Sequence, residues 1–198
     1  GRCGEESTFA VTAYRSVGIA ARQVYTPRWA HCDDNHAWVE VFVDGEWHFL
    51  GACEPEEVLD TGWFSGPANR AILIHTRNFS DYVKESNEEY LGKEGALHYF
   101  NHTSFYGRTK LVKILVKDEK GKLAAGAHGV VEILNMAEFF PAAAVIADAD
   151  GEVQMTLGLG DIRVRAFDGI RRAEAMMRIE EEDSLELVLC EEAVPEAD

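Results

Sequence analysis

The chain has 198 residues, of which 46% are hydrophobic and 27% are charged, which is typical of a soluble globular protein with one large domain or two modest ones. Its formal net charge of −16 argues against nucleic acids and anionic membrane surfaces as partners, because both attract basic patches. The sequence contains no run of about 18 apolar residues, so it predicts no membrane span, and it shows no signal peptide.

The first predicted element is a helix over residues 5–17, with Gly18 as the residue that ends it. The residues expected on its buried face are Phe9, Ala10, Ala13 and Val17. After the helix, residues 19–25 predict a short strand and residues 28–35 a polar loop.

A β-hairpin is predicted next, because the β-rich run "HAWVEVFV" and the returning run "EWHFLGAC" flank a two-residue Asp-Gly turn signal. If the strands continue regularly, the register of such a hairpin places His36 opposite Cys53. Gly51 then lies diagonally on the same face.

The rest of the chain predicts a second, β-rich domain. Residues 54–64 predict a short helix and residues 70–79 a further strand. The polar stretch 80–94 separates two expected domains, residues 1–92 and 93–198. Beyond it, short strand patterns alternate with turns that carry Gly or Asp, which is typical of an all-β sandwich. The expected fold class is therefore an α+β domain followed by a β-sandwich.

Cys3 stands directly ahead of the predicted helix, in "GRCGE". Free backbone N–H groups and the helix dipole at such a position stabilise a thiolate, and the same N–H groups suit an oxyanion. Arg2 adds a cation, and Gly1 and Gly4 let the backbone turn tightly. These residues favour a nucleophilic cysteine.

A catalytic thiol needs an imidazole that takes and returns its proton. His36 is the best placed of the seven histidines, because it begins a strand at the edge of a loop; the alternative is an ordinary polar residue at a strand end. Trp38 and Glu40 are expected on the same face of the strand as His36. Trp38 is interpreted as a core or cleft-wall residue, and Glu40 is a candidate for a role in the site. Cys53 and Cys190 are expected as small buried hydrophobic residues. The spacings of Cys and His match no zinc pattern, so neither a metal nor another cofactor is expected.

Three motifs together resemble the transglutaminase-like superfamily over roughly residues 1–55. They are "GRCGE" ahead of a helix, "NHAWVEVFVDGEW", and the "CE" that follows the second tryptophan of the hairpin. The first and the last are especially similar to the peptide N-glycanase branch. The resemblance implies a papain-like Cys-His-Asp core, in which Cys3 is the nucleophile and His36 is the general base.

One position departs from that pattern, because the family's aspartate would fall at Gly51. The loop before His36 offers Asp34 and Asn35 as replacements, since an amide can also orient a catalytic histidine. Glu54 is nearest in sequence, but regular strand alternation points it to the opposite face. We therefore name Asp34, Asn35, Glu54 and Trp38 as candidates that orient the histidine or line the site.

The second domain also carries a resemblance. "TKLVKILVKDEKGKLAAGAHGVVEI" and "VIADADGEVQMTLGLGDIRVRAFDG" resemble the transthyretin-like, carboxypeptidase regulatory-like sandwich. This resemblance implies a spacer or adhesive module. It favours an extracytoplasmic protein, either periplasmic or secreted.

The sequence thus predicts a thiol-dependent amide hydrolase or acyltransferase that forms an acyl-enzyme on Cys3. Its expected substrate is a protein, peptide or glycopeptide. The alternative is an inactive binding or adhesion module that kept the fold, because the aspartate position is Gly51. Since the chain begins on its active-site motif, we expect further residues upstream. The sequence indicates no oligomeric state.

Overall fold

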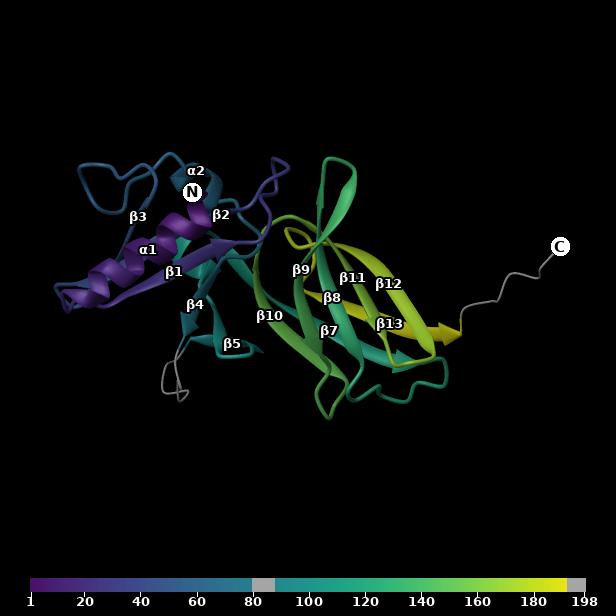
Figure 1. The fold of residues 1–198 in the computed structure, drawn as a ribbon. Coiled ribbons are helices and arrows are strands. Elements are labelled where there is room, and N and C mark those ends of the chain that lie inside the picture. The colour runs from purple at the N-terminus through teal and green to yellow at the C-terminus, as the bar shows by residue number, and fades with distance from the viewer. Residues whose placement is uncertain (80–87, 192–198) are drawn as a thin grey trace. The chain divides into compact units, whose positions relative to one another are not determined.

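The computed structural model describes residues 1–79 and 88–191, and the chain divides into two compact units, Gly1–Thr109 and Lys110–Asp198. Each unit has one β-sheet (Figure 1). The fold is mostly β, and α1 (Cys3–Ser16) is the one helix of the described part that is longer than four residues. None of the described helices combines the length and the apolar character that a membrane crossing requires.

The first unit is built on a six-stranded sheet in the order β3-β2-β1-β4-β6-β5. Its strands are β1 (Ala21–Thr26), β2 (His36–Val43), β3 (Glu46–Leu50), β4 (His75–Phe79), β5 (Glu89–Glu94) and β6 (Leu97–Asn101). Two single-turn helices, α2 (Ser65–Ala68) and α3 (Thr103–Tyr106), follow β3 and β6. The short helix expected over residues 54–64 is absent; that segment is irregular, and α2 begins only after it.

The expected domain boundary between residues 92 and 93 falls inside β5, and the structure places the boundary after Thr109. The physical reason is strand pairing. β6 pairs antiparallel with β4, from His75 opposite Asn101 to Phe79 opposite Leu97, so it completes the first sheet. Residues 80–87, in the middle of the expected separator, lie outside the described residues.

The predicted hairpin register is confirmed. β2 and β3 pair from Val43 opposite Glu46 to Val39 opposite Leu50. The turn residues Asp44 and Gly45 have φ angles of 54° and 91°, as a two-residue hairpin turn requires. Because β3 ends at Leu50, the expected pairing of His36 with Cys53 does not form.

The two faces of the first sheet are covered differently. α1 lies along β1 and β2 on one face (Figure 1). There the Gln23 side-chain amide donates hydrogen bonds to the Gly4 carbonyl at 2.9 Å and to the Ser7 hydroxyl at 2.8 Å. The other face carries the larger apolar cluster. Its buried members are Val24, Trp29, Trp38, Phe49, Phe64, Ala68, Ala71 and Ile74.

The prediction of the buried face of the first helix is wrong for three of its four residues, and of the four only Ala10 packs against the core. Phe9 and Val17 are 76% and 73% exposed, whereas Ser7 and Val11 are buried. The sheet presents a polar side chain, Gln23, to the first half of α1. The helix therefore turns a serine toward the sheet, which apolar periodicity does not detect.

The second unit is an all-β domain, as predicted, with seven strands in the order β10-β7-β13-β12-β11-β8-β9. They are β7 (Thr109–Asp118), β8 (His128–Asn135), β9 (Glu138–Ile146), β10 (Glu152–Gly158), β11 (Asp161–Phe167), β12 (Arg171–Arg178) and β13 (Ser184–Glu191). β13 pairs in parallel with β7, and β11 pairs antiparallel with both β8 and β12. The finer resemblance to transthyretin-like modules stays a prediction.

Candidate functional site

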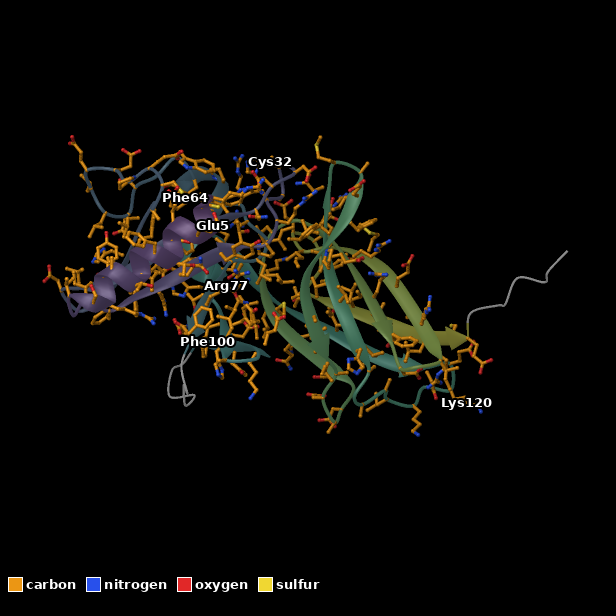
Figure 2. The ribbon with its side chains drawn as sticks, viewed as in Figure 1. Glu5, Cys32, Phe64, Arg77, Phe100 and Lys120 are labelled. Carbon is orange, nitrogen blue, oxygen red and sulfur yellow. The ribbon has the colours of Figure 1, made fainter. Side chains whose placement is uncertain are left out.

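Cys3 is the first residue of α1 and carries a free, half-buried thiol. Arg2 caps the helix with an extended backbone, and its N–H donates to the carboxylate of Glu5, which Figure 2 labels. The first turn of a helix leaves backbone N–H groups without partners inside the helix. The sulfur therefore starts at the positive end of the helix dipole, as the sequence predicts.

Tyr25, which sequence reasoning missed, locates Cys3 on the sheet. Burial raises the pKa of the Tyr25 hydroxyl, the charge of Arg77 opposes this rise, and the charges of Cys3 and Asp34 add to it. Gly4, the residue after Cys3, also accepts a hydrogen bond from Gln23 of β1 at 2.9 Å, so Cys3 lies near the last residues of β1. The neighbouring residue, Thr26, pairs with His36, so Cys3 and His36 share one end of the β1–β2 pair.

The sulfur of Cys3 and the ring of His36 are not joined by a hydrogen bond. Strand register explains this. Thr26 and Val24 pair with His36 and Trp38, so these side chains point to the face opposite α1. The sequence brings both residues to the same end of the sheet, but in this structure they approach it from different sides.

His36 lies among aromatic rings. Its ring centroid is 4.8 Å from Trp63, 5.1 Å from Phe64, 5.7 Å from Trp38 and 6.1 Å from Trp29. The residue is 8% exposed, and its Nε2 atom is buried without a hydrogen-bond partner. Burial lowers the pKa of His36 to about 4. The imidazole is therefore neutral at pH 7, so it can accept a proton but is not a preformed cation.

The candidates for orienting His36 differ in position. The charge of Asp34 acts on His36, where it opposes the effect of burial, and also on Tyr25. Its Oδ1 atom accepts the N–H of Asn35 at 2.8 Å, and both residues are exposed. Glu54 is also exposed. Of the two candidate carboxylates, Asp34 and Glu54, it is Asp34 whose charge acts on the pKa of His36.

Position 51 has no room for the family's aspartate. A Cβ atom added to Gly51 would lie 2.9 Å from the backbone carbonyl oxygen of Glu54 and 3.6 Å from the ring of Phe64. The first distance is shorter than a real Cβ contact, so the backbone of the turn would have to shift. Phe64 (Figure 2) also contacts His36, and an aromatic ring therefore occupies this side of the histidine.

Trp38 is fully buried, and its indole is held by a chain of polar contacts. Its Nε1 donates to the Tyr106 hydroxyl at 2.8 Å, and that hydroxyl donates to Oε1 of Glu40 at 2.5 Å. Glu40 has no exposed surface; it accepts the Arg22 Nε–H at 2.7 Å and lies 3.2 Å from Nε2 of His102. Trp38 is therefore a core residue, and its indole stacks against the ring of His36.

The contacts within this buried network shift the pKa values of Glu40 and Tyr106. Burial alone would raise the pKa of Glu40, but the hydrogen bond and charge of His102, with the charge of Arg22, lower it overall. Burial and the charge of Glu40 raise the pKa of Tyr106 well above its ordinary value. Glu88 adds a second carboxylate, 2.9 Å from Nη1 of Arg22. The one sequence signal for the network is Glu40 itself, an acidic residue inside a buried strand.

The prediction that Cys53 and Cys190 are buried is wrong, because both are exposed. Partial desolvation and a hydrogen bond with the Glu6 carboxylate raise the pKa of Cys53 to about 11. Cys53 lies in the irregular segment after β3, and Cys190 lies near the end of β13. No disulfide joins the four cysteines, all of which lie in the described part of the chain; Figure 2 labels Cys32.

Comparisons with known proteins agree with the first motif set. Residues 1–52 match the family model of the Transglutaminase-like superfamily. This segment contains Cys3 and His36 and forms a transglutaminase-like region, while Tyr106 and the rest of the chain lie outside the match. No curated protein matches the sequence significantly.

Among solved structures, the shaft pilin SpaA from Lactobacillus rhamnosus GG, as its E269A/D295N double mutant, gives a TM-score of 0.36 at 8% identity, over 89% of this chain and 86% of that one. A Streptococcal ancillary pilin gives 0.33 at 10% identity, over 92% of this chain and 65% of that one. These likenesses are too distant to support any argument about function.

Proposed function

We propose that the first unit carries out thiol-dependent acyl chemistry on an amide. The sulfur of Cys3 attacks the carbonyl carbon, a C–S bond forms, and the C–N bond breaks as the thiol proton passes through His36 to the leaving amine. Water or a second amine then releases the acyl group from the thioester. The observation that carries the proposal is the position of Cys3, at the start of α1 and at the end of the sheet where His36 begins β2.

In this proposal His36 acts as a neutral general base. A pKa of about 4 leaves its ring unprotonated at pH 7, so the pair works by proton transfer during the reaction and not as a preformed ion pair. Because Nε2 makes no hydrogen bond, the ring nitrogen is unoccupied by other partners. Because Cys3 and His36 approach this end of the sheet from different sides, the proposal requires both residues to be rearranged before the thiol reaches the ring, and Asp34 supplies the nearby negative charge.

The proposed substrate is a protein, peptide or glycopeptide amide, with water as the preferred acceptor. This preference rests on the peptide N-glycanase-like "GRCGE" and "CE" motifs. The second unit acts in this proposal as a transthyretin-like spacer, which favours a periplasmic or secreted protein.

The full chain mixed with p-nitrophenyl acetate is expected to release a burst of p-nitrophenol equal to about one equivalent, followed by slower turnover, because an acyl-enzyme accumulates. Cys3→Ser abolishes the burst, and Cys190→Ser, a matched change at an exposed thiol, preserves it. Added hydroxylamine accelerates turnover if amines are accepted. A burst that survives Cys3→Ser contradicts the proposal.

A non-catalytic binding module is the second candidate. The closed position at Gly51 and the aromatic surroundings of His36 favour it, since both describe a histidine packed as a core residue. Under this alternative, p-nitrophenyl acetate acetylates Cys3 no faster than it acetylates the exposed Cys190. The burst experiment therefore separates the two candidates directly.

A further inference from the structure

Four side chains form a polar and aromatic cluster on the face of the sheet that α1 covers, namely Tyr25, His75, Arg77 and Tyr99. Tyr25 pairs with His75, and Gln23 and Tyr99 both pair with Arg77, so all of them point to one side. The guanidinium carbon of Arg77 lies 3.8 Å from the centre of the Tyr25 ring. His75 lies between two phenol rings, 5.5 Å from Tyr25 and 5.1 Å from Tyr99.

Two nitrogen atoms of this cluster are unsatisfied. His75 is 6% exposed and its Nδ1 atom is buried without a hydrogen-bond partner, and the same holds for Nε of Arg77. No carboxylate of the described residues lies within ion-pair distance of Arg77, although the chain has 35 acidic residues. On the opposite face, Arg22 has two carboxylate partners. Within the described residues, an arginine without a carboxylate partner needs an explanation.

The cluster adjoins the thiol. Gln23, which pairs with Arg77, donates a hydrogen bond to the carbonyl of Gly4, the residue after Cys3, at 2.9 Å. The charges of Cys3 and Arg77 also both act on the Tyr25 hydroxyl. Cys3, Tyr25 and Arg77 are all half-buried, so solvent reaches each of them. Figure 2 labels Arg77 on this part of the sheet. His75 is neutral at pH 7, since burial and then the charge of Arg77 lower its pKa to about 3, so the guanidinium provides the positive charge.

We propose that Arg77, seated on Tyr25, forms a carboxylate-binding subsite next to Cys3. A guanidinium presents paired N–H donors in the plane that a carboxylate accepts, whereas its stacked face is already used by the phenol. The substrate class is then an amide that carries a free carboxylate close to the bond that Cys3 attacks. The binding of a carboxylate at Arg77 does not depend on the proposed function; only the statement that the bound molecule is a substrate rests on it.

The test compares two alkylating reagents of nearly equal size, anionic iodoacetate and neutral iodoacetamide, and measures their rates at Cys3 in the full chain by mass spectrometry of the tryptic peptide. Arg77→Gln is expected to slow iodoacetate about fivefold to tenfold while changing iodoacetamide less than about twofold, because one nearby charge raises the local concentration of an anion. Arg77→Lys retains part of the preference, and high salt reduces it in the unmodified chain. Lys93→Gln, at an exposed position on β5, is the matched control and changes neither rate.

Two results overturn the proposal. If both reagents slow equally in Arg77→Gln, the arginine only holds Tyr25 in place. If neither slows, its charge does not reach a molecule at Cys3. Alkylation by iodoacetamide needs no catalysis, so failure of the proposed function is a separate result. If Cys3 prefers the anionic reagent but the chain gives no burst of p-nitrophenol, the subsite is supported and the proposed enzymatic function is contradicted.

Discussion

Replacing Glu40 with alanine is expected to lower the free energy of unfolding of the first unit by about 3–5 kcal/mol, because removal of one partner leaves a buried charge uncompensated. Arg22, which has only 6% of its side chain exposed, would lose its closest carboxylate. The Tyr106 hydroxyl would lose its acceptor, and with it the contact that holds the Trp38 indole.

Urea unfolding followed by tryptophan fluorescence measures this effect for the first unit alone, since all four tryptophans lie within residues 1–109. Glu46→Ala, at an exposed position on β3, is the control and should change the unfolding free energy by less than about 0.5 kcal/mol. A loss below about 1 kcal/mol for Glu40→Ala would show that the network is not a stabilising centre.

The first unit is also expected to lose about 4 kcal/mol of stability between pH 6.5 and pH 4.5, about 2 kcal/mol from each of His36 and His75. Burial lowers their pKa values to about 4 and about 3, and for His75 the charge of Arg77 adds to this effect. As the pH falls below 6.5, both histidines bind protons in the unfolded chain but stay neutral in the folded chain, so unfolding becomes more favourable. The loss for each histidine stops growing only below its folded pKa.

Urea midpoints at pH 7 and pH 4.5, again read from tryptophan fluorescence, give the size of this loss. His75→Phe keeps an aromatic ring between Tyr25 and Tyr99 and should remove about half of the pH dependence. His98→Gln, which changes a histidine with an exposed hydrogen bond to Tyr90, should leave it intact. A first unit equally stable at both pH values would mean that neither buried imidazole resists protonation.

The sequence predicted what local chemistry determines. The Asp44-Gly45 turn fixes the hairpin register, and the register places Glu40 on the face of His36. Cys3 begins α1 and His36 begins β2, as the motifs indicate. Each of these features depends on residues close together along the chain.

What the sequence could not predict depends on contacts between distant segments. Tyr106 and His102 reach Glu40 because β6 adds to β4, and no local pattern in residues 97–106 reveals that strand partner. Arg77 meets Tyr25 for a similar reason, through the pairing of β1 with β4. The domain boundary was misplaced by the same cause, since a strand pattern does not say which sheet it joins.

The most direct test of the account is the rate at which p-nitrophenyl acetate acetylates Cys3, measured on the tryptic peptide in the unmodified chain and in His36→Gln. A general base typically contributes about 10²–10⁴-fold, so His36→Gln is expected to slow acetylation at least a hundredfold while tryptophan fluorescence confirms a folded first unit. Acetylation of the exposed Cys190 should be slow and equal in both. If Cys3 is acetylated at the same rate in both proteins, or no faster than Cys190, the two residues do not form a catalytic pair.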